Sequence, residues 1–310
     1  MCKIFSKFFQ QKKVPQLFAL SCFVALYLFF PSSHPLAIES PTPINELQKP
    51  FHGDLSAMKG RHVIRALVTY SKTNFFILKG EPYGFEYDLL QAYIKWLNRN
   101  IKKGQLNTRM VFIPVPFDQL LEGLTSGKGD IAASGLTITP GRLRKISFTI
   151  PYVPNVEEII VTRKKLQGLT SLDDLQGKFL YFAKGTSYRS HLETLNQQFQ
   201  RKNMRSIHLK TVGTHLTTED LLELTNSGAI DHMVADKHIA ELWSSALPHI
   251  QLRPDLTIHQ GGKIAWATRP NNPQLRKSLN SFLKKTKKER CWEIFCLNGI
   301  TKTKSGLRIP

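Results

Sequence analysis

The sequence predicts an α/β protein made of two lobes or domains, and three observations lead to this expectation. The chain has 310 residues, which exceeds the usual size of one domain. Its apolar fraction of 41% suffices for a sizeable core. Buried-strand patterns alternate with stretches of helical periodicity, so each lobe is expected to be a mostly parallel sheet flanked by helices.

The individual elements follow this alternation along the chain. Strands are expected at His62–Thr69, Arg109–Pro114 and Ile131–Ala133. Phe85–Asn98 places apolar residues at helical spacing, and a second helix opens at Phe117. This order predicts a parallel sheet whose carboxyl strand ends carry the ligand groups. The further elements expected are strands at Glu157–Thr162 and Phe179–Ala183, a helix at Thr217–Gly228, strands at Ile230–Val234 and Lys263–Thr268, and a helix at Asn272–Lys284.

The stretch Gly129–Tyr152 carries the strongest signal for a binding site. Gly135 brings bare backbone to the end of a short strand, because it has no Cβ to block a ligand. Thr139-Pro140 predicts a helix N-cap followed by proline at the first helical position. Free N–H groups, the Thr137 hydroxyl and the Arg142 guanidinium would then converge on one point, which suits a carboxylate. The alternative interpretation is a helix start with a surface arginine.

The same stretch resembles a known family. The signature of family 3 bacterial solute-binding proteins, which bind amino acids and related small ligands outside the cytoplasm, is matched by GLTITPGR followed by FTIPY. Within that family the chain is most similar to the non-catalytic N-terminal module of membrane-bound lytic murein transglycosylase F. This closer match is carried by GEPYGFEYDLLQAY, PFDQLLEGLTSGKGDIAASGLTITPGR and SLDDLQGKFLYFAKGTSY. The resemblance covers Arg61 to Asn298.

The resemblance implies a two-lobed periplasmic binding protein-like (type II) fold with a two-stranded hinge. Lobe 1 would comprise residues 61–160 and a return segment, 262–298, and lobe 2 would comprise residues 161–261. The implied function is capture of an amino acid or a short peptide, such as a cell-wall fragment, between the lobes by hinge closure, for uptake or sensing. An ABC permease or a cell-wall enzyme would be the protein partner.

The resemblance also implies which residues of lobe 1 contact the ligand. In the family, the loop after the first strand gives the ligand an aromatic face and polar groups. A second aromatic ring, at the position of Phe117, lies against the ligand, and the arginine of the signature holds a carboxylate. The matching candidates are Tyr70, Ser71, Thr73, Phe75, Phe117, Ser134, Gly135, Thr137 and Arg142. Alternatively, Phe75 and Phe76 belong to the core, and at least one of the two is expected there.

Lobe 2 is expected to contribute Lys184, Thr186, Ser187 and Asp236. Gly185-Thr186-Ser187 lies between a strand and a helix, where amides and hydroxyls can hold an anion. Many amino-acid binders have a cation two residues before this glycine, but that position is Ala183 here and Lys184 follows it. Asp236 matches the aspartate that pairs with a ligand ammonium. Alternatively it only caps the helix at Lys237–Trp243.

Two other functions stay open. The related transglycosylases carry their catalytic glutamate in a lysozyme-like domain after the binding module, and only a short segment follows Asn298 here, so no catalytic residue is expected. A sensory or regulatory module that binds a partner is the other alternative. No cofactor or metal site is expected, because His232 and His238 lie six residues apart, which fits no common zinc pattern.

The two ends of the chain have their own composition. Residues 1–37 have a basic start and an apolar run, Val14–Phe30, which predicts an export signal or an uncleaved anchor. The proline-rich segment 38–60 is expected to be a linker, and residues 299–310 a basic tail. The expected location is the periplasm, with the protein either soluble or tethered to the inner membrane by the apolar segment.

The net charge of +20 favours an anionic partner such as the envelope surface. No nucleic-acid motif accompanies this charge, so nucleic acid is not an expected partner. Cys291 and Cys296 would form a disulfide in an oxidising compartment only if a helix ended between them.

Overall fold

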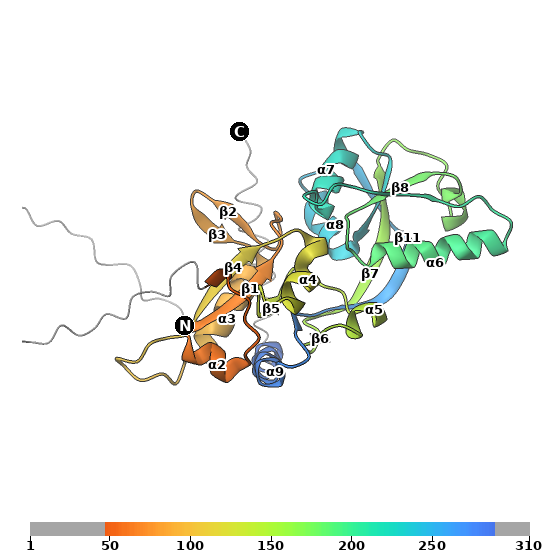
Figure 1. Cartoon of the computed structure of the whole chain (residues 1–310). Helices are drawn as coiled ribbons and strands as arrows, with labels where there is room; N and C mark the ends of the chain where they lie inside the picture. Colours follow the sequence, from red (N-terminus) through yellow and green to blue (C-terminus); the bar gives the residue numbers. More distant parts are fainter. Residues whose placement is uncertain (1–46, 289–310) are drawn as a thin grey trace, which may run out of the picture. The chain divides into compact units, whose positions relative to one another are not determined.

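The computed structural model of the chain describes residues 47–288, which form two α/β lobes (Figure 1). The predicted leader at residues 1–37, the basic tail at 299–310, and the cysteines Cys291 and Cys296 lie outside the described residues. Within residues 47–288, no helix combines the length and the apolar character that a membrane crossing requires.

Lobe 1 is built on a five-stranded sheet of order β4-β1-β5-β12-β6. Its central strand, β1 (Val63–Val68), is buried along its whole length and pairs in parallel with β4 (Arg109–Pro114) and β5 (Ile131–Ala132). The returning strand β12 (Ala267–Thr268) runs antiparallel to β5 and to β6 (Ser147–Phe148). The late return of the chain to lobe 1 therefore closes the sheet with antiparallel pairs.

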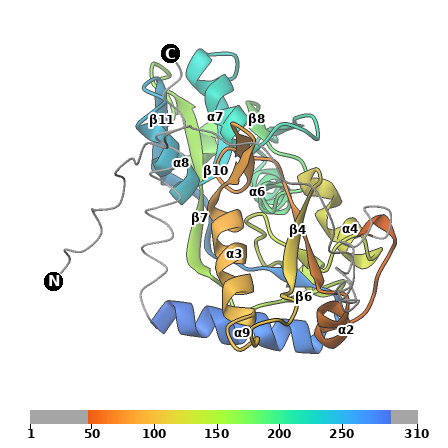
Figure 2. The same ribbon diagram turned by 90° about the vertical axis from the view of Figure 1, so that its left-hand side faces the viewer.

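Helices pack on both faces of this sheet, and their apolar sides form the core of lobe 1. Leu89, Leu90 and Tyr93 of α3 pack with Leu275 and Leu279 of α9 in one buried cluster. Figure 2 shows α9 running beneath α3, with α2 beside the N-terminal end of α9. The helices of lobe 1 are α2 (Leu55–Gly60), α3 (Phe85–Leu97), α4 (Leu120–Thr125), α5 (Pro140–Leu143) and α9 (Pro273–Lys288), with a 3-10 turn at Phe117–Gln119 before α4 and a hairpin of β2 (Phe76–Leu78) and β3 (Glu81–Tyr83).

Lobe 2 contains a second five-stranded sheet, of order β11-β7-β10-β8-β9. Strands β9 (His208–Thr211), β8 (Phe179–Phe182) and β10 (His232–Asp236) are parallel, whereas β10, β7 (Val153–Arg163) and β11 (Ile250–Ile264) are antiparallel. Both sheets are thus mixed. The predicted parallel pairing is present between β4, β1 and β5 in lobe 1 and between β9, β8 and β10 in lobe 2. The remaining pairs, which involve β6, β7, β11 and β12, are antiparallel. The helices of lobe 2 are α6 (Tyr188–Arg201), α7 (Thr218–Ser227) and α8 (Lys237–Ser244).

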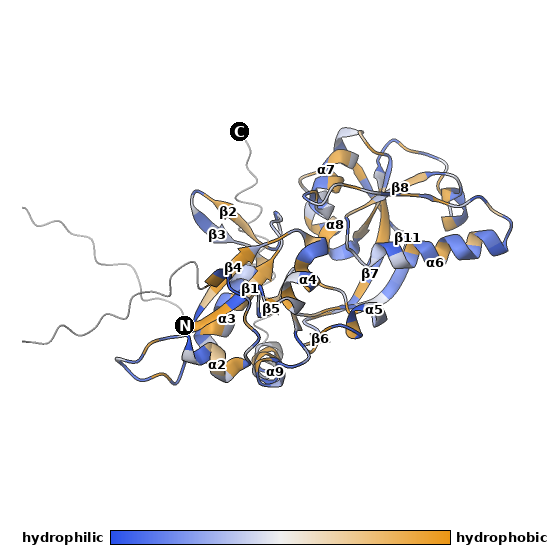
Figure 3. Ribbon diagram, viewed as in Figure 1, coloured by the Kyte–Doolittle hydropathy of each residue, from blue (hydrophilic) through white to orange (hydrophobic). Residues whose placement is uncertain are grey.

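The hydropathy of the elements agrees with this layering (Figure 3). Every residue of β1 and of β10 is buried, and the outer side of α6 is hydrophilic. Helix α7 shows why such elements begin and end where they do: Thr217 and Asp220 form a capping box at its start, and Gly228 in the left-handed conformation ends it.

Two long strands connect the lobes. β7 and β11 pair from Val153 with Ile264 at one end to Arg163 with Ile250 at the other, and the register shifts several times along the ladder. Thr137 of lobe 1 forms an isolated bridge to Ile264, so the hinge ladder reaches the predicted binding stretch. The predicted two-stranded hinge is therefore present as β7 and β11.

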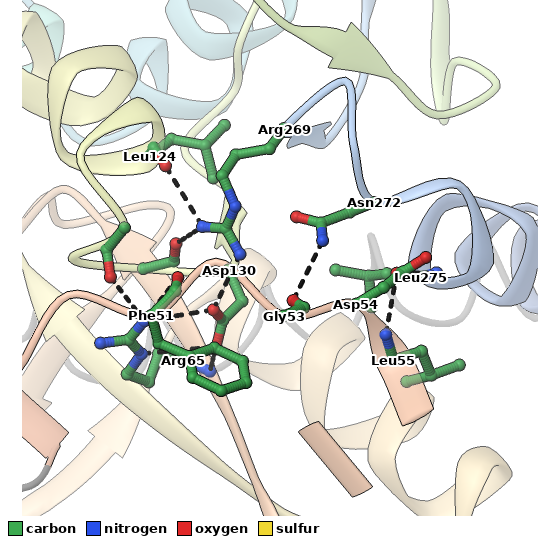
Figure 4. A network of polar contacts seen from close by, with 12 residues as sticks. Phe51, Gly53, Asp54, Leu55, Arg65, Leu124, Asp130, Arg269, Asn272 and Leu275 are labelled. Carbon is green, nitrogen blue, oxygen red and sulfur yellow. Dashed lines mark hydrogen bonds and ion pairs between the residues drawn. The ribbon is translucent and has the colours of Figure 1, made fainter. Parts of the chain in front are cut away.

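The predicted linker 38–60 is wrong for its last part, because residues 47–60 pack on lobe 1. The Asp54 carboxylate accepts hydrogen bonds from the N–H groups of Leu55 (2.8 Å) in α2 and of Leu275 (3.0 Å) in α9. Asn272 Nδ2 donates to the Gly53 carbonyl at 3.0 Å (Figure 4). The expectation of an irregular segment is also wrong for Leu55–Gly60, which form helix α2. The last proline, Pro50, precedes that helix and does not prevent it, and the backbone before α2 is fixed because its polar groups find partners.

The strongest of these partners belong to a buried charge cluster around Asp130. Its carboxylate binds Arg61 at 2.5 Å. It also binds Arg65 and Arg269 at 3.2 Å each (Figure 4). Arg65 is fully buried and also donates to the carbonyls of Leu47 (3.1 Å) and Lys49 (2.9 Å). The chain that enters lobe 1 is therefore held through its backbone by a buried guanidinium.

Candidate functional site

A small pocket lies between the two lobes, next to the hinge, and encloses about 90 Å³. Lobe 1 contributes the ends of its strands and α5, and lobe 2 contributes the starts of α6, α7 and α8. Its polar lining residues are Thr69, Ser71, Asn74, Ser134, Thr137, Arg142, Thr186, Ser187, Tyr188, Thr214, Thr217, Thr218, Glu219, Asp236 and His238, and its apolar ones include Phe117, Leu216, Ile239 and Ile264.

Arg142 is the buried cation of this pocket. Pro140 starts α5, and the Thr139 hydroxyl caps it by accepting from the Arg142 N–H at 3.4 Å, as the sequence predicted. The guanidinium donates to the carbonyls of Thr137 (2.5 Å) and of Gly185 in lobe 2 (2.8 Å). Burial lowers the pKa of Arg142 to about 10, although Glu158 and Asp236 oppose this shift. Arg142 therefore stays charged at neutral pH and touches both lobes.

Asp236 enters the pocket from lobe 2, at the carboxyl end of β10. It holds the N-cap position of α8, yet its side chain makes no capping hydrogen bond. Its Oδ1 atom is buried and has no hydrogen-bond partner among the described residues, and its backbone N–H donates to the Tyr188 hydroxyl at 3.0 Å. Burial, with help from Glu158, raises the pKa of Asp236 to about 8 against the opposing influence of Tyr188 and Arg142. The geometry disfavours a purely capping role.

Glu158 is one of two acidic residues at the site that the sequence analysis did not single out, and Glu219 is the other. Glu158 lies on the hinge strand β7 and is 1% exposed. Its two carboxylate oxygens meet the Ser187 hydroxyl and His191 Nδ1, both at 2.7 Å. The available signal was a glutamate inside a buried-strand pattern, because a carboxylate at such a position requires polar partners. Glu158 links the hinge to the start of α6.

Gly135 brings its backbone to the pocket as expected, but its N–H group is already used in a hydrogen bond. Gly135 has φ +65°, a conformation that favours glycine, and it lines the pocket. Its N–H is not free for an anion, because it donates to Glu86 Oε1 at 2.9 Å. Glu86 is fully buried and also accepts from Trp266 Nε1 (2.7 Å) and from the Tyr152 hydroxyl. Burial raises the pKa of Glu86.

The structure brings most of the predicted site residues to this pocket. Those that line it are Ser71, Phe117, Ser134, Gly135, Thr137, Arg142, Thr186, Ser187 and Asp236. The hydroxyls of lobe 2 already have acceptors, since Thr186 Oγ1 donates to the Ala183 carbonyl at 2.8 Å and Ser187 to Glu158.

Four predicted residues do not line the pocket. Phe75 is 3% exposed and stacks on Phe112 in the core of lobe 1, so the core alternative is correct. Tyr70 is 53% exposed, and its hydroxyl lies 3.5 Å from the Ile77 backbone. Asn74 is the residue of this loop that lines the pocket beside Ser71.

Thr73 and Lys184 contact the opposite lobe outside the pocket. The Thr73 hydroxyl accepts from Trp243 Nε1 of α8 at 3.1 Å. Lys184 is half-exposed and pairs with Asp118 of lobe 1 at 3.0 Å, which keeps its ammonium at the rim. A Cβ on the neighbouring Gly185 would lie 2.7 Å from the Asp118 Cα, so the lobes approach closely here.

A third contact between the lobes lies on the same side as Thr73. Lys72 Nζ reaches Glu223 Oε1 at 2.6 Å and Asp220 Oδ1 at 3.4 Å, both on α7. Together with Thr73–Trp243 and Lys184–Asp118, these pairs are referred to as the rim contacts. All three contacts join residues of lobe 1 to residues of lobe 2 outside the pocket.

Across residues 47–288, no group of His, Cys, Asp and Glu side chains is arranged to hold a metal ion. His238 lines the pocket, and its enclosure by protein lowers its pKa to about 4, so the ring is neutral at neutral pH.

Two α/β lobes are joined by a pair of crossing strands, and a polar pocket between them receives a buried arginine from one lobe and a buried carboxyl group from the other. These features define a two-lobed solute-binding protein. The match to the family model of bacterial extracellular solute-binding proteins, family 3, spans residues 64–294. The chain belongs to that family.

The sequence is similar to relatives of two kinds. One is a membrane-bound lytic murein transglycosylase F of Desulfosudis oleivorans, 28% identical over 72% of this chain and 45% of the relative. The other is ABC transporter arginine-binding protein 1 of Escherichia coli, 26% identical over 69% of this chain and 80% of the relative. The chain thus spans just under half the length of the transglycosylase.

Solved structures show the same fold. An ancestral arginine-binding protein bound to arginine matches with a TM-score of 0.63 and 23% identity, covering 76% of this chain and 96% of its own. An amino acid transporter's substrate-binding protein from Streptococcus pneumoniae, bound to L-arginine, matches with a TM-score of 0.64 and 17% identity, covering 80% and 99%.

Proposed function

We propose that this protein captures an amino acid or a short peptide between its lobes, by closure about β7 and β11, for uptake or sensing. The observation that carries the proposal is that the two lobes bring complementary groups to one pocket. Lobe 1 provides a buried cation, Arg142, and lobe 2 provides a buried carboxyl oxygen without a hydrogen-bond partner among the described residues, Asp236 Oδ1. These are complementary to the two charged groups of a zwitterion.

The chemistry of both groups fits that role. The Arg142 guanidinium has five N–H donors, and the two carbonyls that it contacts leave donors for a ligand carboxylate. Asp236 Oδ1 would accept from the ligand ammonium. Each charge-assisted hydrogen bond contributes about 1.5–3 kcal/mol, so both together support useful affinity.

The similarity to amino-acid binders supports the same ligand class. The Escherichia coli relative is an arginine-binding protein, and neighbouring structures were solved with arginine or with glutamine bound. Because these ligands share their α-carboxylate and α-ammonium groups but differ in side-chain charge, the relatives support the amino-acid backbone as the recognised unit. They do not select a side chain.

Calorimetric titration with the set of natural L-amino acids, and with cell-wall stem peptides, tests the proposal. We expect at least one of them to bind, and Arg142→Ala to weaken that ligand strongly. Small-angle scattering should show a smaller radius of gyration on binding, since a ligand that touches both lobes favours the closed form. Binding that is unchanged in Arg142→Ala would remove the basis of the proposal.

A regulatory relative of lytic transglycosylases, acting on or sensing peptidoglycan, is the second candidate. It is favoured by the match to the transglycosylase of Desulfosudis oleivorans over 72% of this chain. The matched part is binding-protein fold, so we propose that this chain binds without chemistry. Purified protein should leave peptidoglycan uncut, and release of soluble muropeptides would contradict a non-enzymatic role.

The proposed location is the periplasm, either soluble or tethered to the inner membrane, with an ABC permease or a cell-wall enzyme as partner. An export reporter fused after Asn45 would separate a released protein from an anchored one. Association with lipid vesicles rich in anionic headgroups would test whether the net charge of +20 draws the protein to the envelope surface.

A further inference from the structure

The pocket contains one more carboxylate than a simple zwitterion needs. Among its lining residues within 47–288, the fixed positive charge is Arg142, whereas Asp236 and Glu219 both present carboxyl groups. A bound zwitterion would place its carboxylate at Arg142 and its ammonium at Asp236. Glu219 would then face the ligand without any counter-charge.

Glu219 is buried in a way that requires explanation. It lies in the first turn of α7 and is 4% exposed, and its Oε1 atom has no hydrogen-bond partner in the described part of the chain. A buried carboxylate oxygen without a partner is strongly unfavourable. The helix N-terminus favours a negative charge there, but it supplies no hydrogen bond to this oxygen.

The other acids of α7 show that Glu219 is a special case. Asp220 closes the capping box with Thr217 and also lies 3.4 Å from Lys72. Glu223 pairs with Lys72 at 2.6 Å. Glu158, on the hinge strand near the pocket, is used by Ser187 and His191. Of Glu158 and the three acids of α7, Glu219 is the one with a buried carboxylate oxygen that lacks a hydrogen-bond donor among the described residues.

We infer that Glu219 binds a positively charged group on the ligand side chain, so that the pocket selects a dibasic amino acid over a neutral one. This inference rests on the proposed function and specifies its substrate class. Leu216 and Ile239 also line the pocket and can cover the apolar stem of such a side chain. A ligand with a second cation then matches Arg142, Asp236 and Glu219 with one group each.

The test compares L-arginine with L-citrulline, which has the same shape but a neutral urea group in place of the guanidinium. Calorimetric titration of the full chain should give at least tenfold tighter binding of arginine. Glu219→Gln, which keeps the side-chain shape, should lower arginine affinity by ten- to a hundredfold and leave citrulline nearly unchanged. Glu223→Gln is the matched control on the same helix and should preserve the ratio of the two affinities.

The outcomes separate the inference from the proposed function. Equal affinity of the unmutated protein for arginine and citrulline would overturn the selection of a dibasic ligand and leave amino-acid capture intact. Equal losses for both ligands in Glu219→Gln would show a structural role for Glu219 and would also overturn the inference. If no amino acid binds but a cell-wall stem peptide does, the inference fails and the proposed function stands. If neither class of ligand binds, both fail.

Discussion

The pH dependence of ligand binding should report directly on Asp236. Its pKa is raised from 3.8 to about 8, mainly by burial, so the ligand-free protein holds a proton on this carboxyl at neutral pH. A ligand ammonium binds the ionised carboxylate. Binding must therefore expel the proton, and the affinity must rise with pH until Asp236 is already ionised in the free protein.

The size of the effect follows from the pKa. At pH 7, roughly nine in ten molecules carry the proton, so binding should release close to one proton per ligand. The dissociation constant should fall about tenfold for each pH unit between pH 6 and 8, and should level off above that. Asp236→Asn cannot titrate, so its dissociation constant should be flat over this window.

The same shift affects folding with the opposite trend. Because the folded pKa lies above the unfolded one, the stability that this proton contributes is complete below about pH 4 and is lost as the pH rises through about 8. The ligand-free protein should therefore lose melting temperature from pH 6 to 8 relative to Asp236→Asn, while its ligand affinity increases.

Calorimetry in buffers of different ionisation enthalpy measures the proton release. The reasoning is refuted if fewer than about 0.2 protons are released at pH 7, since that value would require a pKa near or below pH 6.5. It is equally refuted if Asp236→Asn retains the pH dependence of the unmutated protein.

Three further predictions concern other parts of the molecule. Arg142→Ala should weaken an amino-acid ligand by about 3 kcal/mol or more, whereas Arg142→Lys should recover part of the loss, as measured by titration. Asp130→Asn should lower the free energy of unfolding, measured in urea, by about 3–5 kcal/mol, because it leaves buried arginines without a counter-charge. The control Asp255→Asn breaks an exposed pair with Arg253 and should change the free energy of unfolding by less than about 1 kcal/mol. Replacing Lys72 and Lys184 together by alanine should enlarge the ligand-free protein in small-angle scattering by loosening the rim contacts; an unchanged radius of gyration would show that these pairs do not hold the lobes together.

Much of the fold could be predicted because it depends on local signals. Thr139-Pro140 starts α5 and places Arg142 in its first turn, since an N-cap hydroxyl and a fixed proline φ act within a few residues. The helical spacing of Leu275 and Leu279 identified the return helix before its partners in lobe 1 were known.

The parts that could not be predicted depend on contacts distant in sequence. Phe75 and Phe117 are the same residue type after a strand, yet Phe112 draws the first into the core and the second lines the pocket. Nothing near Lys184 indicates that Asp118, from the other lobe, pairs with it. Glu158 could have been noticed as a glutamate inside a buried-strand pattern, whereas nothing near Glu219 in the sequence indicates that its carboxylate is buried.

The clamp of Arg65 on the backbone of Leu47 and Lys49 also has a mechanical consequence. Any pull on the chain that precedes Leu47 is transmitted to β1 and, through Asp130, to the segments that carry Arg61 and Arg269. All of these belong to lobe 1, so the load path bypasses β7 and β11. Tension on the N-terminal side would therefore leave lobe 2 free to open and close.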